Sequence, residues 1–100
     1  MHDPDMLREF FEDFRASATK AAIDLQGACA NASAADAESV AHRLKSSARA
    51  VGALALGELC AAIEDAAKSG GVGALDELHT RFAAEMSAVT KSLDLLCSRP

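Results

Sequence analysis

A chain of 100 residues can bury one small hydrophobic core, so we expect a single domain over residues 1–100. Half of the residues are hydrophobic, but 23 of them are alanine and only nine residues are Val, Ile or Thr, which favours an all-α fold over a sheet. A net charge of −5 without a basic run argues against binding to nucleic acid or to an anionic membrane.

The lack of a recognisable targeting signal and the pattern of cysteines both indicate an intracellular protein. No apolar run approaches the ~20 residues of a membrane span, and residues 1–3 do not begin a signal peptide, so we expect the protein in the cytoplasm. Cys29, Cys60 and Cys97 are widely spaced and form no CxxC motif. We interpret them as small buried thiols in a reducing compartment rather than as a metal or redox site.

The first predicted helix begins at residues 3–5, where an acidic N-cap is followed by proline at the first helical position. Apolar residues then recur at spacings of three and four, which is typical of a helix with one buried face. This stripe consists of Leu7, Phe11, Phe14, Ala18, Ala21, Leu25 and Ala28. The helix is predicted to end near residues 30–31.

The second predicted helix opens with a capping box in which Ser33 precedes Asp36 by three residues. Its apolar stripe ends at about residue 51 and consists of Ala37, Val40, Ala41, Leu44, Ala48 and Val51. Gly52 and Ala53 then permit a tight turn or a close approach between helices.

Two further helices follow, one that stops at residues 69–71 and one that runs from after Gly73 to residues 98–100. Gly57 costs the third helix ~1 kcal/mol relative to alanine, which indicates room for a neighbour. The two stripes are Leu56, Leu59, Ile63 and Ala67, and Leu75, Leu78, Phe82, Met86, Val89, Leu93 and Leu96. Four amphipathic helices with short loops predict a monomeric, antiparallel up-down four-helix bundle.

The polar face of the second helix carries the strongest candidate site. His42 lies opposite the buried stripe, so its imidazole should face solvent. Lys45, Ser46 and Arg49 share this face, and the two cations lie ~4.5 and ~10.5 Å along the helix from the histidine. Such cations repel the imidazolium form, leave a ring nitrogen free to attack, and attract a phosphoryl group afterwards. The alternative is a solvated rim in which Lys45 and Arg49 pair with Glu38 or with a neighbouring helix.

Other candidates for chemistry are weaker. His79 lies at the edge of the last stripe, and His2 lies in a terminal segment. The adjacent acids at 64–65 and at 76–77 diverge around a helix and do not converge on a metal. Because the sequence has no glycine-rich phosphate loop and no nucleotide-binding motif, we expect no kinase site, no metal and no cofactor bound by the chain itself.

The residues around the histidine also resemble those of a known family. The shared pattern is His42, Leu44, Lys45, Gly52 and Ala53, and it continues through Leu56, Leu59, Cys60, Ile63 and Glu64. This pattern resembles that of the histidine-containing phosphotransfer (HPt) domain. Many members have glycine directly after the lysine, where this chain has Ser46.

The resemblance implies that His42 accepts a phosphoryl group from a receiver-domain aspartate and passes it to another receiver, with Lys45 stabilising its charge. The implied partners are response-regulator receiver domains and a hybrid sensor histidine kinase, and the receiver would supply Mg²⁺. On this interpretation the partner-binding residues are Arg43, Ser46 and Arg49, and the structural ones are Gly52 and Ala53.

Two alternatives remain open. A non-catalytic helical adaptor would bind a protein partner through the same polar face, but an inactive relative is expected to have lost His42 or Lys45. A dimerising histidine-kinase helix pair normally places an acid directly after the histidine, where this chain has Arg43. Whether a phosphotransfer protein without its own kinase site is an enzyme also stays open.

Overall fold

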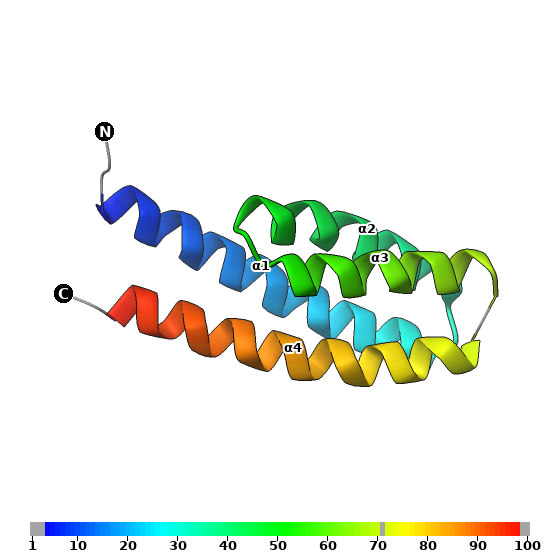
Figure 1. Ribbon diagram of the computed structural model, residues 1–100. Helices are drawn as coiled ribbons and strands as arrows, with labels where there is room; N and C mark the ends of the chain where they lie inside the picture. Colours follow the sequence, from blue (N-terminus) through cyan, green and yellow to red (C-terminus); the bar gives the residue numbers. More distant parts are fainter. Residues whose placement is uncertain (1–3, 71, 99–100) are drawn as a thin grey trace.

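The computed structural model describes residues 4–70 and 72–98, with side chains for residues 5–70 and 73–95. In this part of the chain the secondary structure consists of four α-helices and no strand (Figure 1). The helices are α1 (Pro4–Ala30), α2 (Ala34–Ala50), α3 (Leu54–Lys68) and α4 (Val72–Ser98). The predicted all-α class is confirmed.

The helices form an antiparallel up-down bundle, as the stripes predict (Figure 1). Each helix packs against two others: α1 and α3 each contact both α2 and α4. The most extensive contact is between α2 and α3, which form a short helical hairpin. The helix α1 begins at the same end of the bundle at which α4 ends (Figure 1).

Alanine allows the helices to approach one another closely at the centre of the bundle. Ala18, Ala37 and Ala48 are completely buried. Larger side chains fill the interior where the stripes meet, and the largest of these are Phe82, Leu25, Leu56 and Ile63. Helices of this length are marginal in isolation, so this packing, at about 25 cal/mol per Å² of buried apolar area, holds the fold together.

The start of α2 follows the predicted cap. Ser33 Oγ accepts a hydrogen bond from the Asp36 backbone N–H at 3.4 Å, which satisfies one of the amides that have no partner within the helix. The predicted cap of α1 at Asp3 lies outside the described residues.

The helices α1 and α2 end in the same kind of turn, but with different residues at its left-handed position. After α2, Gly52 has φ of +83°, and Ala53 N–H donates to Ala48 C=O at 2.8 Å. After α1, Ala32 takes this position with φ of +53°. Glycine adopts this conformation without steric cost, whereas a residue with a Cβ atom loses about 1–2 kcal/mol there.

The hairpin of α2 and α3 is shorter than α1 and α4, which leaves two helix ends uncovered (Figure 1). At a rise of about 1.5 Å per residue, the 17 residues of α2 span about 15 Å less than the 27 residues of α1. The predicted inward position of Leu7 is therefore wrong: its side chain is 46% exposed, because the hairpin does not extend over this end of α1. Met6, Phe10 and Leu95 are exposed on the same projecting ends.

Two further details differ from the sequence prediction. The helix α4 already begins at Val72 and includes Gly73, because glycine keeps its backbone hydrogen-bonding groups and costs a helix only about 1 kcal/mol in conformational entropy. Leu59 is half-buried rather than buried, because it lines a surface groove between α3 and α4. The side chain of Leu96 lies outside the described residues.

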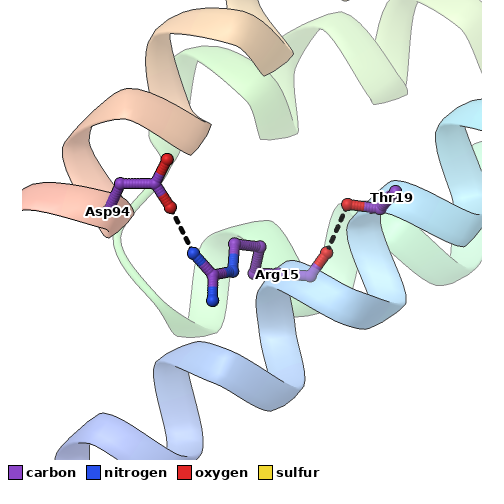
Figure 2. Close-up of polar contacts among 3 residues, drawn as sticks. All are labelled: Arg15, Thr19 and Asp94. Atoms are coloured by element: carbon purple, nitrogen blue, oxygen red, sulfur yellow. Dashed lines mark hydrogen bonds and ion pairs between the residues drawn. The ribbon is translucent and has the colours of Figure 1, made fainter. Parts of the chain in front are cut away.

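A surface ion pair joins the two long helices. Arg15 of α1 pairs with Asp94 of α4, and Thr19 Oγ1 donates a hydrogen bond to the Arg15 C=O at 2.8 Å (Figure 2). The two charged side chains are 36% and 55% exposed, so solvent screens the pair and limits its contribution to about 1 kcal/mol or less. Packing of the stripes therefore determines how α1 lies against α4.

We expect the substitution Ala32→Gly to raise the free energy of unfolding by about 0.5–1 kcal/mol, because it removes the steric cost of the left-handed conformation. Urea unfolding at neutral pH measures the change. The control is Ala16→Gly on the exposed face of α1, which should lower stability by about 1 kcal/mol. A loss of stability at both positions would contradict the turn conformation assigned to Ala32.

Candidate functional site: a histidine held by a buried carboxylate

A shallow hollow lies on the surface where α2 meets α3, and His42 stands in it. The His42 side chain is 69% exposed, in agreement with its predicted position opposite the buried stripe. Most of the residues that line the hollow belong to α2, and α3 contributes Glu64 and Lys68. Its lining is Ala35, Glu38, Ser39, His42, Arg43, Lys45, Glu64 and Lys68.

A carboxylate of α3 holds the imidazole. His42 Nδ1 lies 3.2 Å from Glu64 Oε2, and the Glu64 side chain is only 7% exposed. Because an ionised carboxylate can only accept hydrogen bonds, Nδ1 must carry the ring proton in this contact. In the neutral ring the lone pair then lies on Nε2, at the opposite edge of a ring that is open to solvent.

The second oxygen of Glu64 binds Lys45. Lys45 Nζ lies 2.6 Å from Glu64 Oε1, and beyond this ion pair Oε1 has no hydrogen-bond partner among the described residues. The Lys45 ammonium, aided by His42, holds the pKa of the Glu64 carboxyl below its usual value, although burial acts in the opposite direction. Glu64 is therefore ionised at neutral pH and bridges a cation and an imidazole.

Glu64 is a site residue that the sequence prediction lacks. From the sequence, the acids at 64–65 are only an adjacent pair that does not converge on a metal, and Glu64 is part of the family resemblance. The available signal was its position: Glu64 follows Cys60 by four residues and precedes Ala67 by three, so an acid lies on the buried face of α3. A buried acid needs a partner, and on this face the partners come from α2.

The side chains of Lys45 and Arg49 both lie against residues of α3. Of the two pairings considered for Lys45, with Glu38 or with a neighbouring helix, the structure has the second. A Cβ atom on Gly57 would lie 3.2 Å from Arg49 Cγ, so the Arg49 side chain occupies space that glycine leaves open. This contact is the close approach that Gly57 predicts, and it anchors Arg49 on α3 rather than at the imidazole.

The other predicted site residues are spread along α2 and the turn that follows it. Arg43 is exposed and lines both the hollow and a second groove on the α1 side of α2. Ser46 is exposed one turn beyond His42. Gly52 and Ala53 form the turn between α2 and α3, and this turn sets the register in which the two helices meet.

Of the two described thiols, one is buried as predicted and the other is only half-buried. Cys60 is completely buried, and burial together with a nearby carboxylate raises its pKa to about 11. Burial also raises the pKa of the half-buried Cys29. The side chain of Cys97 and all of His2 lie outside the described residues. Within the described ranges, no three His, Cys, Asp or Glu side chains come close enough to share a metal ion.

The described part of the chain is thus a helical bundle with an exposed imidazole, one ring nitrogen of which contacts a buried carboxylate. The family model of the Hpt domain matches residues 5–92, so the chain belongs to the Hpt domain family, which implies histidine phosphotransfer in a phosphorelay. Neither the curated proteins nor the solved structures contain a match. In residues 4–70 and 72–98, no helix combines the length and apolar character that crossing a membrane requires.

We expect Lys45→Ala to lower the free energy of unfolding by about 1–3 kcal/mol at pH 7, because it leaves a buried carboxylate with one partner fewer. The pKa of Glu64 is depressed in the folded state, so its contribution is fully present above its usual pKa of 4.5 and is lost as the pH falls through the lower folded value. The deficit of the variant should therefore shrink below pH 4.5.

Urea unfolding from pH 7 to pH 3 measures this difference. The matched control is Lys68→Ala, since Lys68 lines the same hollow but has no ion pair within the described part of the chain. Its effect should be under about 0.5 kcal/mol at every pH. A Lys45→Ala deficit that stays constant with pH would show that the ion pair with Glu64 does not stabilise the fold.

Proposed function

We propose that this protein is a phosphocarrier in a phosphorelay. His42 accepts a phosphoryl group from the aspartate of a receiver domain, or of a hybrid sensor kinase, and passes it to the aspartate of another receiver. The observation that carries the proposal is the contact between His42 Nδ1 and Glu64 Oε2, because it leaves Nε2 unprotonated on an exposed ring. Membership of the Hpt domain family supports the same reaction.

The transfer needs no proton to leave the imidazole. Nε2 attacks phosphorus with its lone pair while the bond from phosphorus to the aspartate oxygen breaks, and the electron pair of that bond leaves with the carboxylate. The ring then bears the phosphoryl group on Nε2, a proton on Nδ1 and one positive charge. Glu64 already faces Nδ1 and stabilises this charge. The return transfer reverses each step.

Lys45 is proposed to stabilise the transferred group through its charge. It lies one helical turn from His42, and its long side chain gives the ammonium freedom to move from the Glu64 oxygen toward a phosphoryl group. The group carries close to two negative charges at neutral pH, so the attraction exceeds that of a single carboxylate. The carboxylate keeps the ammonium beside the imidazole until the phosphoryl group arrives.

The proposed partners are response-regulator receiver domains and a hybrid sensor histidine kinase, and the receiver brings the Mg²⁺ that transfer from its aspartate requires. We propose that the protein acts as a monomer. The proposed compartment is the cytoplasm, which suits the free thiols of Cys29 and Cys60.

His42→Gln tests the acceptor assignment. Glutamine can still donate a hydrogen bond to Glu64 but has no nucleophilic nitrogen, so the variant should fold normally and take up no phosphate from a panel of receiver domains phosphorylated with acetyl phosphate. The measurement is transfer of acid-labile, alkali-stable label, with His79→Gln as the control that retains it. Label that persists in His42→Gln would refute the assignment, and a wild-type protein that binds receivers without taking label would support the adaptor alternative.

Substitutions at Ser46 test the direction from which the receiver approaches His42. The residue is exposed, ~6 Å along α2 from His42, where a large side chain would stand in the path of the incoming aspartate. Ser46→Gln should leave stability equal or slightly higher but slow transfer at least about tenfold, whereas Ser46→Gly should transfer at nearly the wild-type rate. Stopped-flow or quenched transfer assays compare the two, and equal rates would show that receivers approach from elsewhere.

A further inference from the structure

Residues 5–15 of α1 and 85–95 of α4 form a shelf at and beyond the end of the α2–α3 hairpin (Figure 1). A hollow of about 290 Å³ lies where this shelf meets the turn between α2 and α3. Its lining residues are Phe11, Val51, Gly52, Ala53, Glu85, Ala88, Val89, Ser92 and Leu93. None of them lines the hollow around His42, so a partner bound here need not cover the imidazole.

Large apolar side chains are exposed on the shelf beside this hollow. Met6 and Phe10 of α1 are 68% and 47% exposed, and Leu7 is exposed as well. The ring centroid of Phe10 lies 5.8 Å from that of Phe11, which lines the hollow. Because side chains of this size usually pack inside, a group of them on one surface indicates an interaction site.

The shape of the shelf suits a helix rather than an extended peptide. The described residues contain no strand, so an extended peptide would find no sheet edge with which to pair. The helix α2 is about 15 Å shorter than α1, a length that about 10 residues of helix fill. A helix laid along α1 and α4 beyond the hairpin would place apolar side chains, spaced by three or four residues, against Phe10 and the hollow.

The charge of the shelf indicates the chemistry of this helix. Residues 5–15 and 85–95 have a net charge of −3. The acids are Asp5, Glu9, Glu12, Asp13, Glu85 and Asp94, and the bases are Arg8, Arg15 and Lys91. Of these, Arg15 and Asp94 pair with each other. Such a surface attracts a basic helix and repels nucleic acid, an anionic membrane and a second copy of the same shelf.

Two of the acids adjoin the apolar surface directly. Glu85 lines the hollow. Asp13 is exposed and follows Phe10 by three residues, which places it one turn along the same side of α1. A basic side chain at the edge of the apolar face of a bound helix would therefore meet a carboxylate on either flank.

We propose that this shelf binds a basic amphipathic helix of a partner protein. The apolar face of the helix packs on Phe10 and into the hollow beside Phe11, and its Lys or Arg side chains face Asp13 and Glu85. The inference does not depend on phosphotransfer, because the shelf and the hollow around His42 share no lining residue. It gives the chain a second attachment point that leaves the imidazole accessible.

The probe for this site is a fluorescent peptide of about 15 residues, with leucines spaced for one helical face and lysines on the other. One control peptide has glutamate in place of lysine, and a second has the leucines in shuffled positions. Fluorescence anisotropy measures the Kd of each peptide for the full chain. Equal binding of the basic and acidic peptides, or of the ordered and shuffled ones, would overturn the proposal.

The apolar contact is tested by Phe10→Ser, with Ile23→Ser as the matched control. Both are exposed apolar residues of α1, but Ile23 lies outside the shelf. We expect Phe10→Ser to raise the Kd of the basic peptide about tenfold and Ile23→Ser to leave it within about twofold of wild type. Thermal unfolding checks that both variants remain folded. An unchanged Kd in Phe10→Ser, or equal increases in both variants, would contradict the assigned surface.

The ionic contact is tested by Glu85→Gln, with Glu77→Gln as an exposed control on the same helix. At low salt Glu85→Gln should raise the Kd about threefold and Glu77→Gln should not change it, and the difference should shrink as the salt concentration rises. Equal effects at the two positions would show that the peptide responds only to the overall charge of the chain, and the proposed orientation would fail.

Amide chemical shifts of the wild-type protein locate the peptide without any substitution. We expect the shifts that change on binding to concentrate in residues 5–15 and 85–95, and shifts centred elsewhere would overturn the proposal. A wild-type dimer in sedimentation that Phe10→Ser dissociates would assign the shelf to a second copy. Binding to anionic vesicles that Phe10→Ser abolishes would assign it to a membrane. Either result would replace the basic helix as the occupant.

Discussion

The site depends on two contacts that one buried carboxylate makes with side chains of the neighbouring helix. Glu64 lies on α3, whereas both of its partners, His42 and Lys45, lie on α2. A lone carboxylate in this position would be costly to bury, and its two partners offset that cost. The contact with His42 also favours the ring proton on Nδ1, so an interaction that stabilises the fold orients the imidazole as the proposed function requires.

Such a carboxylate is a poor choice for stability alone. An apolar residue at position 64 would continue the stripe of α3 without the cost of desolvating a charge, and replacements of this kind are often neutral or stabilising. It would, however, leave the imidazole free to rotate and to carry its proton on either nitrogen. The buried charge of Glu64 therefore orients the histidine that we propose as the phosphoacceptor.

Much of the fold follows from the sequence, because stripes, caps and turn residues act within one helix or across one turn. The exposure of His42 could be predicted in the same way, from its angle to the stripe of its own helix. The position of Leu7 could not, since it depends on how far other helices extend. Nor could the bridge from Glu64 to Lys45, or the contact of Arg49 with Gly57, because each requires the rotation of α3 relative to α2.

The shortness of the α2–α3 hairpin has a consequence for how the molecule opens locally. His42 and Glu64 are 22 residues apart in the chain, and the helices that carry them are connected by one tight turn. Bringing the two residues together therefore carries a small loop-closure entropy. The ends of α1 and α4 project beyond this hairpin and are the parts that should fray first. Fraying there separates none of the contacts among His42, Lys45 and Glu64, so the geometry of this cluster does not depend on the helix ends.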